Sequence, residues 1–369
     1  MTPSDATATA ALQDREFSAR LDARLREFFR AERERVTGIS SSATDLVDAI
    51  ERLTHGGKRL RARLCYWGWR AAGGGADAPE PEIAAAALEL FQTAALIHDD
   101  ILDRSDTRRG SPSVHRVFES LHRESRWAAD AEHFGVSAAV LTGDMSLSFA
   151  EQLFADAAAR VPAPAAARAR ELFSTMRTEV MVGQYLDIHA EVAPAPADPR
   201  EQLERAMTVL RYKSAKYSVE HPVSIGAALA GAEPAFLTAC TGFALPLGEA
   251  FQLRDDVLGV FGDPETTGKP AGDDIREGKR TALVALCAQG GDSAENAWLD
   301  SVLGRPDLDA EDITRARALI RDSGALRRSE ELIDSLVTTS DEGLAALATD
   351  GVSRAGLRNL ANAAVRRAR

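Results

Sequence analysis

Cysteine and long apolar runs are scarce in this sequence, and basic residues are fewer than acidic ones; each shortage excludes a class of protein. The 369 residues include three cysteines, which are far apart and odd in number. They fit neither a disulfide framework nor a zinc site, so they predict a reducing, cytoplasmic location. No apolar run is long enough to span a bilayer. The formal net charge of −12 argues against nucleic-acid binding and against binding to an anionic membrane.

Strand-type alternation of polar and apolar residues is also scarce, whereas Ala, Leu, Arg and Glu are abundant. Helices should therefore dominate, and we predict an all-α fold. No linker separates two cores, so residues 13–369 are predicted to form one helical-bundle domain. Residues 1–12 are small and polar without a basic stretch, and we predict a disordered lead-in there.

The clearest helices are predicted over residues 82–102 and 234–260. Both are apolar nearly all round, which is typical of buried helices. Two more long helices are predicted over 136–159 and 165–190. The segment 262–277 contains three glycines and reads as a long loop, a length that often indicates a function.

Two acidic clusters stand out because each is set in one of these apolar runs. The first is Asp99, Asp100 and Asp103, and the second is Asp255 and Asp256. Carboxylates at the end of a core helix repel one another and resist desolvation, so such clusters usually need a hard cation. On facing helices they would form a magnesium site for a polyphosphate. The plain alternative is a solvated acidic helix end.

Basic residues accompany both clusters, in segments where glycines and helix N-terminal amides favour an anion. Each alone could be a solvated surface charge, the role expected of Arg59 and Arg63. The candidates for phosphate binding are Lys58 and Arg61 after a Gly-Gly pair, Arg108 and Arg109 after the first cluster, and Lys269 and Lys279 after the second.

The order of these motifs resembles that of the trans-prenyl diphosphate synthases, the polyprenyl synthetase family, and in particular the bacterial geranylgeranyl diphosphate synthases. The motifs are Gly-Gly-Lys-x-x-Arg, Asp-Asp-x-x-Asp with Arg-Arg, Gly-Gln, Lys-Ser-Ala, Phe-Gln-x-x-Asp-Asp and Gly-Lys, in order between residues 43 and 279. The resemblance implies a helical bundle of the isoprenoid synthase type with a central active-site cavity. It also implies a homodimer and three Mg²⁺ ions.

The resemblance also implies residue roles. Asp99, Asp103 and Asp255 match metal ligands, and Asp100 and Asp256 match their supporting neighbours. Lys58, Arg61, Gln92 and Arg109 match the site for isopentenyl diphosphate. Arg108, Lys213 and Lys269 match residues that hold the allylic diphosphate, and Gln184, Asp187, Ser214, Gln252 and Lys279 match further positions around it.

One position departs from the family. Gly259 stands where the second motif usually has a third aspartate. Glycine inside a helix costs about 1 kcal/mol relative to alanine. Because the first aspartate of this motif carries most of the metal contact in the family, we retain the catalytic interpretation, with weaker magnesium affinity as a consequence to test.

The implied reaction condenses isopentenyl diphosphate with a dimethylallyl, geranyl or farnesyl diphosphate to an all-trans product. Magnesium and the cations Arg108, Lys213 and Lys269 would stabilise the departing pyrophosphate. The allylic cation would be attacked by the double bond of isopentenyl diphosphate. The pyrophosphate would remove the proton, so the mechanism requires no protein base.

Product length depends on the helix face beneath Asp99 and Asp103, along which the growing chain should run. Ala95 and Ala94 are small, and Phe91 is one turn lower, about 5 Å deeper. Phe91 is thus a candidate floor for a geranylgeranyl product. Alternatively, Phe91 packs away from the tunnel, Leu88 is a later floor, and the product is longer.

Three other functions compete with this one. They are a longer-chain polyprenyl diphosphate synthase (C25 or more), a class I terpene cyclase and a non-catalytic partner subunit. Lys58, Arg61 and Arg109 argue against a cyclase, which lacks a site for isopentenyl diphosphate. The complete first acidic motif argues against a non-catalytic subunit.

Overall fold

The computed structural model describes residues 2–262, 272–290, 292–305 and 307–365, and nearly all of their regular structure is helical. The all-α prediction is therefore confirmed. The chain divides into two compact units. The first contains residues 1–169, 226–232 and 351–356, and the second contains residues 170–225, 233–350 and 357–369. The boundary of a single domain at 13–369 stays a prediction.

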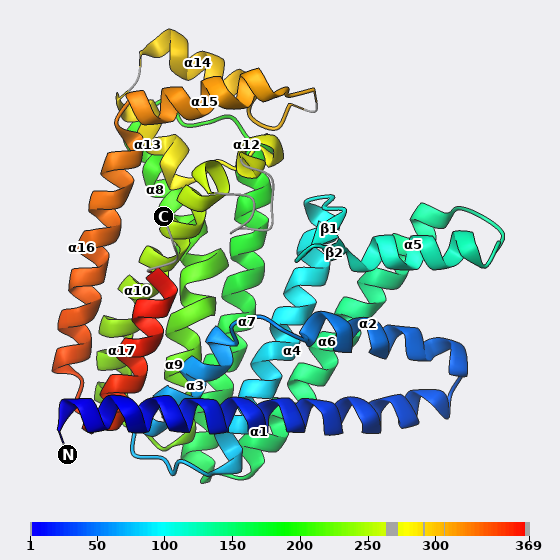
Figure 1. Ribbon diagram of the computed structural model, residues 1–369, viewed down its shortest axis with the longest axis vertical. Coiled ribbons are helices and arrows are strands. Elements are labelled where there is room, and N and C mark those ends of the chain that lie inside the picture. Colours follow the sequence, from blue (N-terminus) through cyan, green and yellow to red (C-terminus); the bar gives the residue numbers. More distant parts are fainter. Residues whose placement is uncertain (1, 263–271, 291, 306, 366–369) are drawn as a thin grey trace. The chain divides into compact units, whose positions relative to one another are not determined.

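The first unit is built around α4, which starts with Pro79 in its first turn, where a missing N–H does no harm. Almost every turn of α4 is buried, and α4 runs alongside α6 (Figure 1). The elements of the first unit are α1 (Pro3–Thr37), η1 (Ser41–Ala43), α2 (Thr44–Thr54), α3 (Leu60–Ala71), α4 (Pro79–Leu102), β1 (Thr107–Arg108), β2 (Ser111–Pro112), α5 (Val114–Glu124) and α6 (Ala131–Ala159).

The predicted disorder of residues 1–12 is wrong for residues 3–12, which form the first turns of α1. The Thr2 side chain accepts a hydrogen bond from the Asp5 backbone N–H, and the Asp5 carboxylate accepts one from the Thr2 N–H. This capping box satisfies two backbone donors at the helix start. Ala6 and Ala10 are buried on the face that continues through Phe17. The small residues thus pack rather than remain solvated.

The second unit is built around α10 (Pro234–Phe261), which lies beside α16 (Ala325–Ala346) (Figure 1). Arg254 of α10 makes two hydrogen bonds, of 2.5 and 2.7 Å, to the Glu330 carboxylate of α16, which fixes the rotation of α10 about its axis. The other helices here are η2 (Leu210–Glu220, a π-helix), α8 (Pro199–Val209), α12 (Asp273–Glu277), α13 (Ala282–Gly290), α14 (Ser293–Val302) and α15 (Ala310–Asp322).

Three helices have residues in both units: α7 (Ala163–Val192), α9 (His221–Leu229) and α17 (Gly351–Val365). The four long helices expected from the sequence are present as α4, α6, α7 and α10. The expected loop at 262–277 differs at its end, where residues 273–277 form α12, while residues 263–271 lie outside the described residues. A search of the described helices for one apolar and long enough to cross a bilayer finds none.

Candidate active site

The first acidic cluster lies at the C-terminal end of α4. The Asp103 backbone N–H donates to the Asp99 carbonyl at 2.8 Å, so the two residues are one helical turn apart, as predicted. Asp100 is fully buried. The Arg108 Nε donates to Asp100 Oδ1 at 2.7 Å, and its Nη2 donates to Asp99 Oδ2 at 3.1 Å. Burial opposes the charge of Arg108, but these two carboxylates outweigh it and raise the Arg108 pKa.

A tight hairpin presents Arg108 and Arg109. Arg108 pairs with Ser111 across β1 and β2, which leaves Arg109 and Gly110 as a two-residue turn. Both have positive φ, 54° for Arg109 and 74° for Gly110. Two-residue turns of this kind match the twist of the flanking strands only when both central residues adopt the left-handed region. This hairpin was not predicted from the sequence.

Arg109 lies against the Gly-Gly-Lys-x-x-Arg segment. Its Nη1 donates to the Leu53 carbonyl at 3.3 Å, and a Cβ built on Gly57 would be 3.3 Å from its Nη2. Partial burial of the Arg109 guanidinium group and the charges of Arg108, Arg59 and Arg61 lower the Arg109 pKa, although the residue as a whole remains exposed. Arg109 and Arg61, two of the cations predicted to bind isopentenyl diphosphate, therefore lie near each other, beside the Gly57 that precedes Lys58. Arg109 and Lys58 are exposed and Arg61 is partly exposed, so an anion can reach them.

Arg59 and Arg63 are not the solvated surface charges that were expected, because both are partly buried and form ion pairs. Arg59 forms ion pairs with Glu89 at 2.9 Å and Asp22 at 3.1 Å. Arg63 pairs with Asp14 at 2.6 Å. These arginines tie α1 to the start of α3 and to α4. His98, beside the acidic cluster, is likewise held by the Val140 carbonyl at 3.4 Å and Asp144 at 3.5 Å.

One stripe of α4 remains partly exposed. It contains Gln92, Ala95, Asp99 and Asp103, spaced three or four residues apart. Ala94 and Phe91 are buried instead. At 100° per residue they are rotated about 140° and 80° from Asp99 around the helix axis. Of the three chain-length candidates, Ala95 thus shares the face of the acidic cluster most closely.

In the second unit, two lysines converge on one carboxylate. Lys213 of η2 and Lys279 both donate to Asp187 Oδ2, the latter at 3.3 Å, and Lys279 also reaches Glu191 at 3.1 Å. Burial opposes the charge of Asp187, but the two ammonium groups outweigh burial and lower its pKa. The network joins α7, η2 and the segment after α12.

Glycine makes this network possible. A Cβ at Gly183 would lie 2.3 Å from the Lys213 backbone nitrogen, so only glycine lets α7 approach η2 closely enough. Gly248 of α10 similarly faces the Ala215 carbonyl, at 2.4 Å from a built Cβ. Each glycine lies four residues before a predicted site residue, Asp187 or Gln252. The Gly-Gln motif that contains Gly183 does not indicate this close approach, and the sequence carries no signal for the π-helix.

A second hydrogen-bonded chain joins the predicted allylic residues to the second acidic motif. The Ser214 hydroxyl donates to Gln252 Oε1, and the Gln252 amide donates to Asp256 Oδ1 at 2.9 Å. Asp256 is buried, and burial together with the charges of Asp274 and Asp255 raises its pKa well above the usual value. Asp255, in contrast, is partly exposed. Asp256 is thus the inner, supporting acid, and Asp255 is the accessible one.

We expect Asp187→Asn to destabilise the protein by about 1.5–3 kcal/mol, because two partly buried ammonium groups would lose their shared anion. The native pKa of Asp187 is below its usual value, so its contribution is complete above about pH 4 and fades as pH falls through the native pKa. Urea unfolding of both proteins at pH 7 and pH 3 checks this. An equal difference at both pH values would contradict it.

The acids are suited to a hard cation but do not form a complete protein cage. Among the described residues, no three His, Cys, Asp or Glu side chains are grouped so that they could hold an ion alone. Mg²⁺ is usually bound by one or two carboxylates, with waters and substrate phosphates completing its shell. Partly exposed Asp99, Asp103 and Asp255 fit that pattern. Lys269 lies outside the described residues.

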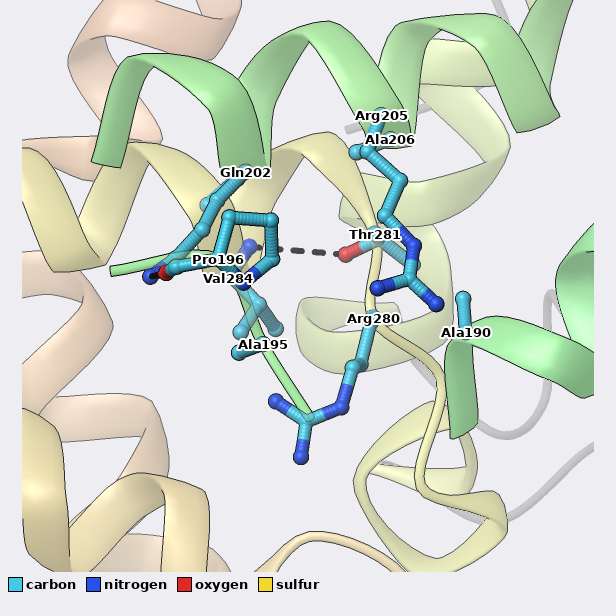
Figure 2. A pocket seen from close by; sticks show the side chains of 10 residues that line it. Ala190, Ala195, Pro196, Gln202, Arg205, Ala206, Arg280, Thr281 and Val284 are labelled. Atoms are coloured by element: carbon cyan, nitrogen blue, oxygen red, sulfur yellow. Dashed lines mark hydrogen bonds between the residues drawn. The ribbon is translucent and has the colours of Figure 1, made fainter. Parts of the chain in front are cut away.

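A small pocket in the second unit is separate from these residues (Figure 2). Its arginines are already held by the chain: Arg205 by the Pro194 and His189 carbonyls, and Arg280 by Asp300. The Val284 N–H donates to the Thr281 hydroxyl at 3.5 Å, which caps α13. None of the predicted site residues lines this pocket, so we leave it out of the candidate site.

Comparisons with known proteins identify the family of the chain. A family model described as polyprenyl synthetase matches residues 44–320. A geranylfarnesyl diphosphate synthase of Aeropyrum pernix is 33% identical over 276 residues, 74% of this chain and 79% of that protein. A geranylgeranyl diphosphate synthase of Sulfolobus acidocaldarius is 31% identical over 284 residues, 77% and 79% of the two chains. The crystal structure of a Corynebacterium glutamicum geranylgeranyl pyrophosphate synthase, complexed with isoprenyl diphosphate and magnesium, is 40% identical, with a TM-score of 0.88 over 96% of this chain and 99% of that one.

Proposed function

The chain belongs to the polyprenyl synthetase family, and we propose that it is a Mg²⁺-dependent trans-prenyltransferase with geranylgeranyl diphosphate as its main product. Its substrates would be isopentenyl diphosphate and a dimethylallyl, geranyl or farnesyl diphosphate. The observation that carries the proposal is the convergence of Arg109 with the Lys58–Arg61 segment, close to the end of α4 that bears the acidic cluster. A terpene cyclase needs no second diphosphate site of this kind.

We assign a different set of basic residues to each of the two diphosphates. We assign isopentenyl diphosphate to Lys58, Arg61 and Arg109, together with Gln92 on the partly exposed stripe of α4. We assign the allylic diphosphate to Arg108, Lys213 and Lys269. Fixed cations stabilise the charge that develops on the leaving pyrophosphate without having to reorganise during the reaction.

The remaining residues hold these groups in place. Asp187 keeps Lys213 and Lys279 together, and Gln184 lies on the same helix, within one turn. Ser214 and Gln252 fix the inner acid, Asp256. We assign Asp99, Asp103 and Asp255 as the magnesium ligands, in a set of three ions. Bound Mg²⁺ would supply Lewis-acid stabilisation of the departing pyrophosphate.

Product length is tested by two substitutions on α4. We expect Phe91→Ala to lengthen the products and Ala94→Phe to shorten them, because Ala94 lies about one turn and Phe91 about two turns below the acidic cluster. Chromatography of dephosphorylated products measures both. The relatives include a geranylfarnesyl and a geranylgeranyl synthase at similar identity, so the wild-type product needs the same assay. An unchanged distribution for Phe91→Ala would exclude this residue as the floor, in keeping with its burial beside the exposed stripe.

We further propose a homodimer in the cytoplasm. Apolar side chains remain exposed on α6, at Val140 and Leu141, and on α7, at Met181, Val182 and Tyr185. A second copy that covered them would remove apolar area from water. The three cysteines are free and buried, as expected in a reducing compartment. Sedimentation velocity at micromolar concentration tests the assembly, and a monomer would overturn it.

The decisive experiment for the activity uses the isolated protein. It is incubated with labelled isopentenyl diphosphate, Mg²⁺ and each allylic primer in turn. Incorporation of label into longer prenyl diphosphates is the expected result. Cyclised hydrocarbon without incorporation would indicate a cyclase. No reaction with any primer, from a folded protein, would indicate a non-catalytic subunit.

A further inference from the structure

Position 259 is where the second acidic motif departs from its family, and the structure gives a steric reason. A Cβ built on Gly259 would lie 2.1 Å from Oδ2, 2.4 Å from Cγ and 2.6 Å from Oδ1 of Asp274. These distances are far inside van der Waals contact. The carboxylate of Asp274, from α12, therefore occupies the space in which any side chain at position 259 would begin.

The backbones on either side of this contact are fixed. Val260 follows Gly259, Ile275 follows Asp274, and both are buried in the same hydrophobic cluster of the second unit. The Gly304 N–H also donates to the Ile275 carbonyl at 3.0 Å. A side chain at 259 could thus be accommodated only if the Asp274 side chain turned away or α12 moved off α10.

The position of α12 matters for the cationic network described above. The Lys279 backbone N–H donates to the Asp274 carbonyl at 2.9 Å, which closes the end of α12. The Lys279 side chain then reaches Asp187 and Glu191. Displacement of α12, which carries the Asp274 carbonyl, would therefore be passed on to the lysine pair that shares Asp187.

We propose that Gly259 is a notch that receives the Asp274 carboxylate, so that α12 replaces α10 as the source of the third acidic group beside Asp255 and Asp256. Gly259 and Asp274 act as a pair of positioning residues. It follows that Gly259→Asp, which restores the usual family residue, impairs the protein rather than improving it. This link to catalysis rests on the proposed function, whereas the packing itself does not.

A thermal-stability cycle tests the packing without any activity measurement. Gly242 is the matched control, because it lies on the same helix and a Cβ there meets nothing within 4 Å. Gly242→Ala should raise Tm, since alanine is the better helix former. Gly259→Ala should lower Tm in the wild type but raise it in an Asp274→Gly background. If Gly242→Ala and Gly259→Ala change Tm equally in both backgrounds, the proposed packing of Asp274 against Gly259 is wrong.

A second experiment tests the link to ligand binding. The probe is Mg²⁺ with inorganic pyrophosphate, and its binding is measured as the rise in Tm that it produces. Gly259→Asp should require about 10- to 100-fold more probe for the same rise, as expected when a supporting group of a metal site is lost. The exchanged pair, Gly259→Asp with Asp274→Gly, should recover most of this response. If Gly259→Asp binds the probe as well as or better than the wild type, the proposal fails. If the variants give the expected changes in Tm but the wild-type protein catalyses no prenyl transfer, the proposed function is refuted and the packing proposal stands.

Discussion

Asp99→Asn and Asp255→Asn should each lower kcat/KM for prenyl transfer by about 10³-fold or more. Each change removes a carboxylate charge assigned to the magnesium ions, and such ions contribute several kcal/mol of charge stabilisation in the transition state. Both side chains are partly exposed, and asparagine has nearly the same shape, so folding should persist. Steady-state kinetics with labelled isopentenyl diphosphate measures the loss, and unfolding curves confirm that the variants are folded.

The double variant distinguishes a shared site from two separate ones. If both carboxylates act on the same diphosphate, removing the second should cost much less than removing it from the wild type, because groups that act as a unit are not additive. Asp106→Asn is the control, since Asp106 is exposed and its carboxylate forms an ion pair with Arg116, which has no role in the proposed site. Independent, multiplying losses would contradict one shared diphosphate.

Among glycine-to-alanine substitutions next to the network of Lys213, Asp187 and Lys279, Gly183→Ala should have the largest effect. The new Cβ would lie 2.3 Å from the Lys213 nitrogen and 2.5 Å from the Tyr212 carbonyl carbon, both backbone atoms. No rotamer change relieves such contacts, so η2 must shift. We expect a loss of about 1–3 kcal/mol in stability. A shift of about 1 Å at Lys213 would also lower kcat/KM by about 100-fold.

Urea unfolding and the prenyl transfer assay measure the two effects. Alanine at position 242 again provides the comparison, because it adds the same methyl group to a helix where there is room for it. A Gly183→Ala protein that is as stable and as active as the wild type would show that α7 and η2 do not need their close approach.

The long helices were predictable because their apolar content exceeds what a surface helix needs. Residues 82–102 and 234–260 are apolar on nearly every face, and both form buried helices. The acidic clusters were predictable for the same reason, since charges inside an apolar run stand out. The grouping of Arg109 with the Gly-Gly-Lys segment followed from the resemblance, not from the spacing of the residues.

Other features depend on contacts that a local pattern does not contain. The π-helix that carries Lys213 and Ser214 has no local signature, and the roles of Gly183 and Gly248 appear only when the neighbouring backbone is placed. The start of α1 is different, because its Thr2 to Asp5 capping box was present in the sequence. It was missed because small residues were equated with disorder.

The hairpin turn at Arg109 also has a consequence for engineering. A non-glycine residue in the left-handed region is strained, and replacement by glycine often relieves of the order of 1 kcal/mol. A library of variants screened for heat resistance alone would therefore tend to select Arg109→Gly or Arg109→Asn. Such variants would survive heating while losing a cation assigned to substrate capture. Any thermostabilised version of this enzyme should thus be selected for turnover at low isopentenyl diphosphate concentration as well.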